Sequence, residues 1–210
     1  MEVFTYLQTV VLAYLLGSIP TGYLVARARG VDIRSVGSGN IGATNVFRIL
    51  GKQAGIIVLT VDALKGFLAT WLLPILVPMI FPGGDSIKEW LQITAGISAV
   101  LGHNYTCWLK FKGGKGIATS AGVLIALFPM AFLVCLGVWL IVFLASKYVS
   151  LASILAAACL PIAVWFFNAS TRMLVVAILM AALAIYKHRA NIDRLLKGTE
   201  NRFGKKKTPK

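Results

Sequence analysis

Long apolar runs alternate with short polar segments along the chain. A helix that crosses a bilayer needs about 20 mostly apolar residues. The pattern therefore predicts an all-α, polytopic membrane protein in which each apolar run supplies at least one transmembrane helix. The runs cover approximately residues 3–26, 54–81, 88–109, 117–146, 149–167 and 171–187.

The run at 117–146 is long enough for two helices. As a single helix it would extend about 45 Å, against a hydrocarbon core of about 30 Å. Pro129 lies near its middle, and proline ends or kinks a helix. The alternatives are one long tilted helix, or two shorter helices that turn near residues 128–130. In the second case the first helix has to start within the glycine segment at 113–116.

The composition excludes a soluble domain. Of the 210 residues, 58% are hydrophobic and only 13% are charged, which is about half of the charged share in a soluble domain. Disorder is excluded as well, because it requires low hydrophobicity. The length fits a single integral membrane domain over residues 1–210. Cys107, Cys135 and Cys159 lie in or beside apolar runs, where cysteine packs as a small hydrophobe.

Lysine and arginine are distributed very unevenly. The chain holds 21 of them against seven acidic residues, and cytoplasmic loops of membrane proteins carry an excess of Lys and Arg. Seven spans place eighteen of the 21 on one side, whereas six spans place the nine in the C-terminal tail opposite the five in the first loop. The sequence thus predicts seven spans, an outside N-terminus and a cytoplasmic basic tail at 188–210. The predicted spans are 3–26, 54–81, 88–109, 115–128, 130–146, 149–167 and 171–187.

The first polar segment, residues 35–45, is rich in glycine and in side-chain donors. Its spacing fits GxGxxG, but a dinucleotide site needs a strand and a βαβ unit around that motif. Glycine still lets backbone N–H groups converge on an anion, and a following arginine suits phosphate. A flexible polar loop is an equally good interpretation on chemistry alone. The candidate phosphate ligands are Ser38, Gly39, Asn40, Thr44, Asn45 and Arg48.

The second polar segment joins residues 102–105 to a glycine- and lysine-rich stretch at 110–116. It is not a Walker A motif, because Gly116 stands where that motif has Ser or Thr after the lysine. Glycines between two lysines at a helix start nevertheless suit an anion. Ordinary positive-inside lysines are the alternative, and the histidine is equally well explained as a helix-end hydrogen-bonding group. The candidates are His103, Lys112, Gly114 and Lys115.

The third polar segment, residues 187–204, contains the second histidine. His188 and Asp193 fit HxxxxD, a catalytic pattern of one group of glycerolipid acyltransferases. Positions i and i+5 of one helix lie about 140° apart, so we interpret this match as accidental. His188 and Asn191, at i and i+3, do share a helix face and are the candidates in this segment.

All three segments face the cytoplasm in the seven-span arrangement, which predicts one site for a multiply charged anion. Acids are few near it, which argues against a metal-dependent phosphotransferase, and no motif indicates a covalent acyl-enzyme. We therefore expect neither a metal nor a cofactor. Asp62 and Lys65 lie deep in the second span at i and i+3. We interpret them as a mutually satisfied pair between helices, with a functional role for the charges as the alternative.

Together the three segments resemble the bacterial acyl-phosphate:glycerol-3-phosphate acyltransferases. The similar stretches are SVGSGNIGATN at 35–45, GHNY at 102–105 with KFKGGKG at 110–116, and KHRANI with LLKGTENRFG within 187–204. The resemblance implies a bacterial inner-membrane enzyme with a cytoplasmic active site. It would transfer a fatty acyl group from a long-chain acyl phosphate to the 1-hydroxyl of glycerol 3-phosphate. The products would be lysophosphatidate and phosphate. The enzyme would be surrounded by membrane lipids. It would bind no nucleic acid and require no protein partner.

The resemblance also implies roles for single residues. The candidates of the first segment would bind phosphate, together with Lys112 and Gly114, and Lys115 would neutralise the charge that develops during reaction. His188 and Asn191 would position the glycerol hydroxyl. The base stays open between His188 and a substrate phosphate oxygen. The phosphate is slightly favoured, because no acid in the sequence evidently orients the histidine.

A transporter of phosphorylated metabolites is the alternative from another functional class. It would share the basic loops and the apolar bulk, but it predicts polar residues along a path across the membrane. Here the polar residues gather at one predicted face, and only Asp62 and Lys65 lie deep.

Overall fold

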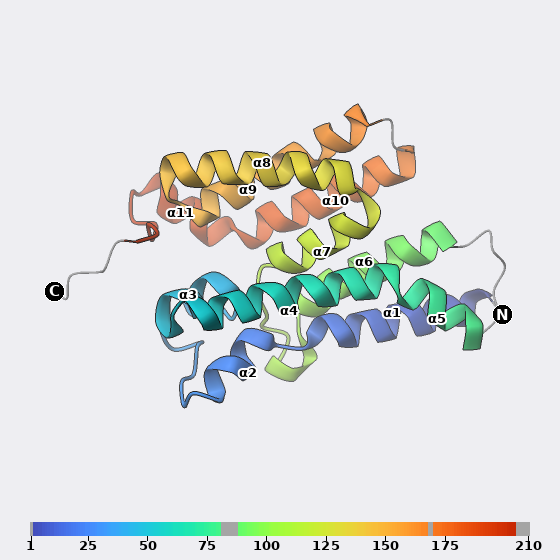
Figure 1. Cartoon of the computed structure of the whole chain (residues 1–210), viewed down its shortest axis with the longest axis horizontal. Helices are drawn as coiled ribbons and strands as arrows, with labels where there is room; N and C mark the ends of the chain where they lie inside the picture. Colours follow the sequence, from blue (N-terminus) through green and yellow to red (C-terminus); the bar gives the residue numbers. More distant parts are fainter. Residues whose placement is uncertain (1, 81–87, 168–169, 205–210) are drawn as a thin grey trace. The chain divides into compact units, whose positions relative to one another are not determined.

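The computed structural model describes residues 2–80, 88–167 and 170–204, and within these ranges the regular structure is helical (Figure 1). The all-α prediction is thus confirmed for this part of the chain. The chain forms two compact units, unit 1 over Met1–Phe128 and unit 2 over Pro129–Lys210. The end of the predicted second span at residue 81 and the lysines at 205–207 lie outside the described residues.

Unit 1 is built around one long helix, α4 (Lys52–Trp71). This helix packs against each of the other α-helices described in the unit. A short 3-10 turn, η2 (Cys107–Leu109), lies between the last two of them. The helices around α4 are α1 (Glu2–Ser18), α2 (Thr21–Arg27), α3 (Ala43–Leu50), α5 (Leu73–Ile80), α6 (Lys88–Asn104) and α7 (Ile117–Leu127).

Glycines let the helices of unit 1 approach closely. A Cβ atom on Gly17 of α1 would overlap the carbonyl of Ala99 in α6. Another on Gly66 of α4 would overlap the carbonyl of Thr119 in α7. Helices in lipid associate largely through such contacts of small residues. The two contacts fix α6 and α7 within the unit, and with them the loop that joins these helices.

Two of the predicted spans are broken helices. The first breaks at Ile19 and Pro20, between α1 and α2, and the second breaks at Leu72, just before Pro74. Proline has no N–H to donate to the preceding turn, which accounts for both positions. The hydrophobic pattern alone could not locate these breaks, because it continues through them.

The predicted break at Pro129 is present, since α7 ends at Leu127 and α8 (Pro129–Ser146) begins directly afterwards. The expectation that the preceding helix starts within the glycine segment is wrong. Helix α7 begins at Ile117, because Gly116 before it has φ 81° and lies outside the helix. With 11 residues, α7 extends about 16 Å, roughly half of the hydrocarbon core.

Unit 2 is built around α9 (Val149–Phe166), which packs against the other helices described in that unit. The axes of its last two helices differ by 57°, with the break at His188. After α11 the chain returns to the turn between α8 and α9, where the Phe203 amide donates to the Lys147 carbonyl at 2.8 Å. The helices around α9 are α8, α10 (Thr171–Lys187) and α11 (Arg189–Leu196).

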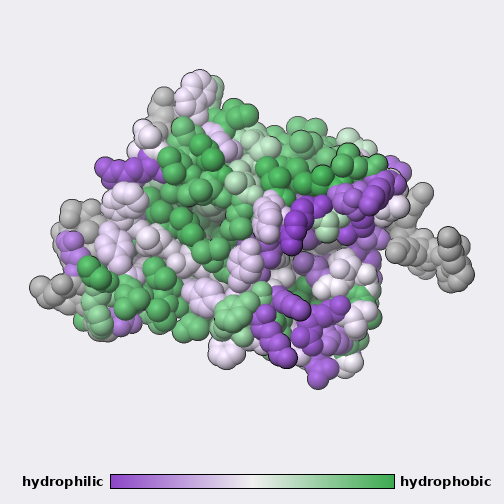
Figure 2. All heavy atoms as spheres, turned by 180° about the vertical axis from the view of Figure 1, so that it is seen from behind, coloured by the Kyte–Doolittle hydropathy of each residue, from purple (hydrophilic) through white to green (hydrophobic). Residues whose placement is uncertain are grey.

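Several of the described helices can cross a membrane. Four helical segments are long and apolar enough, namely α1 with α2, α4, α8 and α9, and α10 with α11 would make a fifth. Their outer faces expose large apolar side chains, such as Ile141 (71% exposed) and Ile162 (65%). Figure 2 shows hydrophobic side chains, in green, over broad stretches of the surface. Soluble proteins rarely expose apolar areas of this extent, so the chain is a multi-pass membrane protein.

Candidate functional site

Asn45 holds the first polar segment together from inside. Its side chain is buried in the first turn of α3, and Oδ1 accepts a hydrogen bond from the Ser38 amide at 2.9 Å. Nδ2 donates to the carbonyl oxygens of Val36 at 3.1 Å and Asn40 at 3.0 Å. This predicted phosphate ligand is therefore engaged with its own loop, and its visible effect is to shape that loop.

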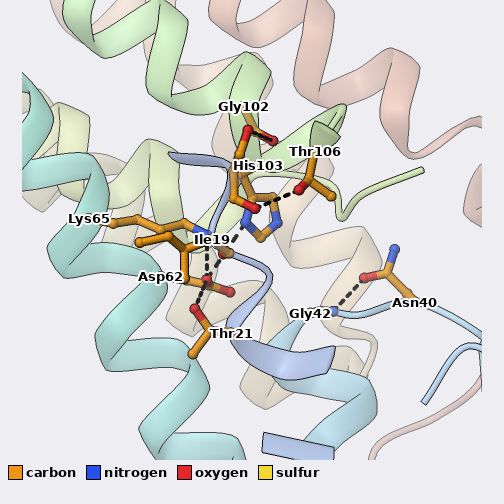
Figure 3. A network of polar contacts seen from close by, with 10 residues as sticks. Ile19, Thr21, Asn40, Gly42, Asp62, Lys65, Gly102, His103 and Thr106 are labelled. Atoms are coloured by element: carbon orange, nitrogen blue, oxygen red, sulfur yellow. Dashed lines mark hydrogen bonds and ion pairs between the residues drawn. The ribbon is translucent and has the colours of Figure 1, made fainter. Parts of the chain in front are cut away.

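Ser38 and Asn40 present polar atoms at the surface of this loop. Ser38 is exposed between Gly37 (φ 63°) and Gly39 (φ 69°), a left-handed conformation that favours glycine. The Oδ1 atom of Asn40 accepts a hydrogen bond from the Gly42 amide at 2.8 Å, while its amide nitrogen points away (Figure 3). The loop thus combines a fixed backbone with outward donors.

Helix α3 starts directly behind these donors. Gly42 is its extended N-cap residue, and Thr44 lies in the first helical turn. Arg48 is exposed and lies one turn further along the same face, at i+4 from Thr44. Unbonded amides at a helix start attract anions, so the donors of the loop, the helix start and a cation share one region.

An ion pair closes the beginning of the same loop. The Arg34 guanidinium donates to both oxygens of Asp32, at 2.9 and 2.7 Å. Side-chain and backbone hydrogen bonds from Arg34 lower the pKa of Asp32 to about 2. Because its charge is matched by Asp32, Arg34 adds little net charge to the anion affinity of the loop.

The second polar segment lies directly against the end of α6. The Gly113 amide donates to the Asn104 carbonyl at 3.2 Å, and the Gly114 amide donates to the His103 carbonyl at 3.0 Å. A Cβ atom on Gly114 would overlap the His103 imidazole, so glycine is required there. The exposed Lys112 and the half-buried Lys115 flank this contact, just before the start of α7.

His103 is buried beneath the glycines and faces a charged pair. Its Nδ1 lies 3.7 Å from Oδ1 of Asp62. Asp62 in turn lies 2.8 Å from Nζ of Lys65 and accepts a hydrogen bond from the Thr21 hydroxyl at 3.0 Å (Figure 3). Lys65 also donates to the Ile19 carbonyl at 2.8 Å. The predicted ion pair between Asp62 and Lys65 is therefore present, and its contacts reach from α4 to α2 and α6.

One hydrophobic cluster joins the first two polar segments within unit 1. Ile33 and Ile41 of the first loop and Val46 of α3 pack in the same buried cluster as Leu109, which precedes the second loop. Helix α2 packs directly against the first loop. The approach is so close that a Cβ atom on Gly22 would overlap the Ile41 carbonyl. The structure thus brings together the segments that hold Ser38, Arg48, Lys112 and Lys115.

The third segment belongs to unit 2, where His188 occupies the break between α10 and α11. Its Nδ1 lies 2.8 Å from the Ala184 carbonyl oxygen. A carbonyl oxygen can only accept, so Nδ1 carries a hydrogen and donates it to Ala184. The convergence of this segment with the other two stays a prediction.

Glu200 organises the third segment, although the sequence did not single it out. Its Oε1 accepts hydrogen bonds from Asn191 at 2.8 Å and from Ser150 of α9 at 2.9 Å, and its Oε2 accepts from Arg194 at 2.7 Å. Burial opposes ionisation of the Glu200 carboxyl, but these hydrogen bonds and the Arg194 charge hold its pKa below the ordinary value. An acidic residue inside the most basic stretch of the chain was the signal that could have revealed it.

Asp193 lies on the exposed side of α11. It pairs with Lys197 at 2.8 Å, whereas His188 is buried at the helix break. The interpretation of the HxxxxD match as accidental is consistent with this difference in burial.

Known proteins resemble this chain over nearly its whole length. The model of the family described as glycerol-3-phosphate acyltransferase matches residues 7–198. The glycerol-3-phosphate acyltransferase of Geotalea daltonii is 47% identical over 191 residues, which cover 91% of this chain and 94% of that protein. The one from Aquifex aeolicus is 47% identical over 194 residues, covering 92% and 97%.

Two solved structures also resemble it. Both are crystal structures of PlsY (YgiH), an integral membrane glycerol 3-phosphate acyltransferase. The glycerol 3-phosphate form has a TM-score of 0.86 at 46% identity and covers 95% of this chain and 96% of that one. The lysophosphatidic acid form has a TM-score of 0.83 at 45% identity and covers 95% of each. The chain therefore belongs to the glycerol-3-phosphate acyltransferase family.

Proposed function

We propose that this protein transfers a fatty acyl group from a long-chain acyl phosphate to the 1-hydroxyl of glycerol 3-phosphate. The products are 1-acylglycerol 3-phosphate and inorganic phosphate. The observation that carries the proposal is the similarity, over 95% of the chain, to a structure of an integral membrane glycerol 3-phosphate acyltransferase in its glycerol 3-phosphate form. The loops of unit 1 supply the chemistry that a phosphorylated substrate requires.

The two loops of unit 1 bind the phosphate groups. Ser38, Gly39, Asn40 and Thr44 offer donors around the start of α3, and Arg48 adds a fixed charge. Lys112 extends this surface at the second loop, whereas the predicted ligand Gly114 is buried with its amide bonded to the His103 carbonyl, so its contribution is to shape that loop. Lys115 neutralises the charge on the carbonyl oxygen and on the departing phosphate as the transition state forms. Asn45 contributes by holding the first loop in shape.

The reaction itself needs no nucleophilic side chain. The 1-hydroxyl oxygen of glycerol 3-phosphate bonds to the acyl carbon, and the bond from that carbon to the phosphate oxygen breaks. Acyl phosphate is already activated, so correct orientation of the alcohol supplies much of the rate. His188 and Asn191 orient the hydroxyl, and the hydroxyl proton passes to a phosphate oxygen of the substrate.

His188 is the alternative acceptor for that proton. In the neutral imidazole, Nδ1 donates to the Ala184 carbonyl and Nε2 is the nitrogen that can accept a proton. A neutral carbonyl orients the ring but stabilises the imidazolium less than a carboxylate does. This difference favours the substrate phosphate as the base.

We further propose that the chain crosses the bacterial inner membrane seven times. The N-terminus would lie outside, and the polar loops and C-terminus in the cytoplasm. The support is the charge count, with eighteen of 21 Lys and Arg on one side. The short α7 can complete its crossing only together with the non-helical glycine segment before it.

The test is turnover by the purified protein in detergent, supplied with palmitoyl phosphate and labelled glycerol 3-phosphate. We expect labelled lysophosphatidate with acyl phosphate and none with acyl-CoA. Product with acyl-CoA alone would overturn the donor assignment. If no product formed with either donor and glycerol phosphate were taken up into sealed proteoliposomes, the protein would be a transporter and not an acyltransferase.

A further inference from the structure

The Asp62–Lys65 pair is buried more deeply than packing requires. Their side chains are 2% and 3% exposed, inside a helix that is long and apolar enough to cross the membrane. Burying two charges costs free energy that their mutual attraction often fails to repay. Elsewhere α4 packs through small residues such as Gly66. The position of the pair therefore calls for a role beyond joining two helices.

The pair connects three parts of unit 1 at one point. Lys65 donates to the Ile19 carbonyl, at the break between α1 and α2, and Asp62 accepts from Thr21 in the first turn of α2. The imidazole of His103, near the end of α6, lies 3.7 Å from the same Asp62 oxygen. One carboxylate thus holds α2 to α4 by a hydrogen bond and faces the imidazole at the end of α6 (Figure 3).

Each of these parts supports one of the two phosphate-binding loops. The His103 ring lies against Gly114, the residue before Lys115, and the His103 carbonyl accepts from the Gly114 amide. On the other side, Gly22 follows Thr21 and lies against the Ile41 carbonyl of the first loop. Two short chains of contacts therefore lead from Asp62, one to each loop.

We propose that Asp62 and Lys65 are positioning residues for substrate phosphate. Through His103 they fix the Gly113–Gly116 loop and the direction of Lys115, and through Thr21 and α2 they fix the loop at 35–45. This role rests on the proposed function, since the loops are taken to bind phosphate. The pair itself does not touch substrate.

The decisive variant is the double substitution Asp62→Asn with Lys65→Met. It removes both charges at nearly constant volume, so no uncompensated charge remains buried. For the detergent-purified full chain, we expect at least a tenfold rise in KM for glycerol 3-phosphate and a matching loss of the thermal stabilisation that glycerol 3-phosphate confers. The control is Thr70→Val, which removes a buried hydroxyl of the same helix and should keep both quantities within twofold of wild type.

A milder variant keeps the inference testable if the double variant does not fold. Thr21→Val removes one hydrogen bond to Asp62 without changing the charge, and should raise KM for glycerol 3-phosphate about threefold. Wild-type KM and wild-type stabilisation by glycerol 3-phosphate in either folded variant would overturn the positioning role. Failure of the proposed function is recognised separately, because the wild-type protein would then make no lysophosphatidate.

Discussion

The two units hold their candidate residues in different ways. In unit 1 the loops are shaped by backbone contacts, by glycines that touch neighbouring groups and by Asn45, which binds its own loop. In unit 2 the carboxylate of Glu200 binds Asn191, Arg194 and Ser150 together. Unit 1 should therefore be sensitive to added atoms, and unit 2 to the loss of one charge.

The largest effect is expected in unit 1, for Lys115→Ala. Removing a cation that stabilises developing charge costs about 10³-fold in turnover. The measurement is kcat/KM with acyl phosphate as donor. Cys135→Ala, in α8, is the control and should change kcat/KM less than about twofold. Comparable activity of the two variants would show that Lys115 does not take part in the reaction.

The next effect tests the tolerance of unit 1 for an added atom. Gly114→Ala places a methyl group on the His103 imidazole, which must displace the second loop. A displacement of about 1 Å at a reaction site can cost about 10²-fold in rate. The matched control is Gly137→Ala in unit 2, where a Cβ atom meets nothing within 4 Å. Equal activities would show that the loop adapts to the added methyl.

His188→Ala distinguishes positioning from base catalysis in unit 2. If a substrate phosphate takes the proton, we expect kcat at saturating substrates to fall about tenfold, as for one lost hydrogen bond of about 1.4 kcal/mol. The pH dependence of kcat should then keep its shape. A fall of about 10²–10⁴-fold with loss of a pH limb would assign the base to His188 instead.

The smallest effect is expected for Glu200→Gln. The neutral amide keeps the shape of the side chain but loses the charge that holds Arg194, so kcat should fall about fivefold and α11 should loosen. Because the pKa of Glu200 is lowered in the folded protein, its stabilisation is present above about pH 4.3. It is lost as the pH falls through the folded pKa.

Thermal unfolding near pH 7 and near pH 3, which is well below the ordinary pKa of about 4.3, measures this contribution. The wild-type protein should lose more stability on acidification than Glu200→Gln. Asp193→Asn, on the exposed side of α11, is the control and should match the wild type at both pH values. Identical acid sensitivity in all three proteins would contradict the organising role of Glu200.

The sequence predicted the features of this fold that depend on local chemistry. Apolar length located the helices, and Pro129 located the break between α7 and α8, because proline acts on its own turn. The three polar segments were recognised from their residue types and spacing. These features require no knowledge of what lies elsewhere in the chain.

The remaining features depend on how the chain folds back on itself. The start of α7 at Ile117 follows from the packing of the preceding glycines on the end of α6, which residue types alone do not reveal. Asn45 looked like a ligand because its amide suits phosphate, but the loop backbone uses it. Glu200 gains its importance from Ser150, fifty positions away.

The contact between Gly114 and His103 has a consequence for redesign of the enzyme. Position 114 admits no side chain, so a library randomised there would return glycine and little else. The loop around Ser38 is open to solvent, and Ser38 itself can be replaced without such a clash. Attempts to change the affinity for the phosphate group should therefore diversify Ser38 and Asn40 while leaving the second loop intact.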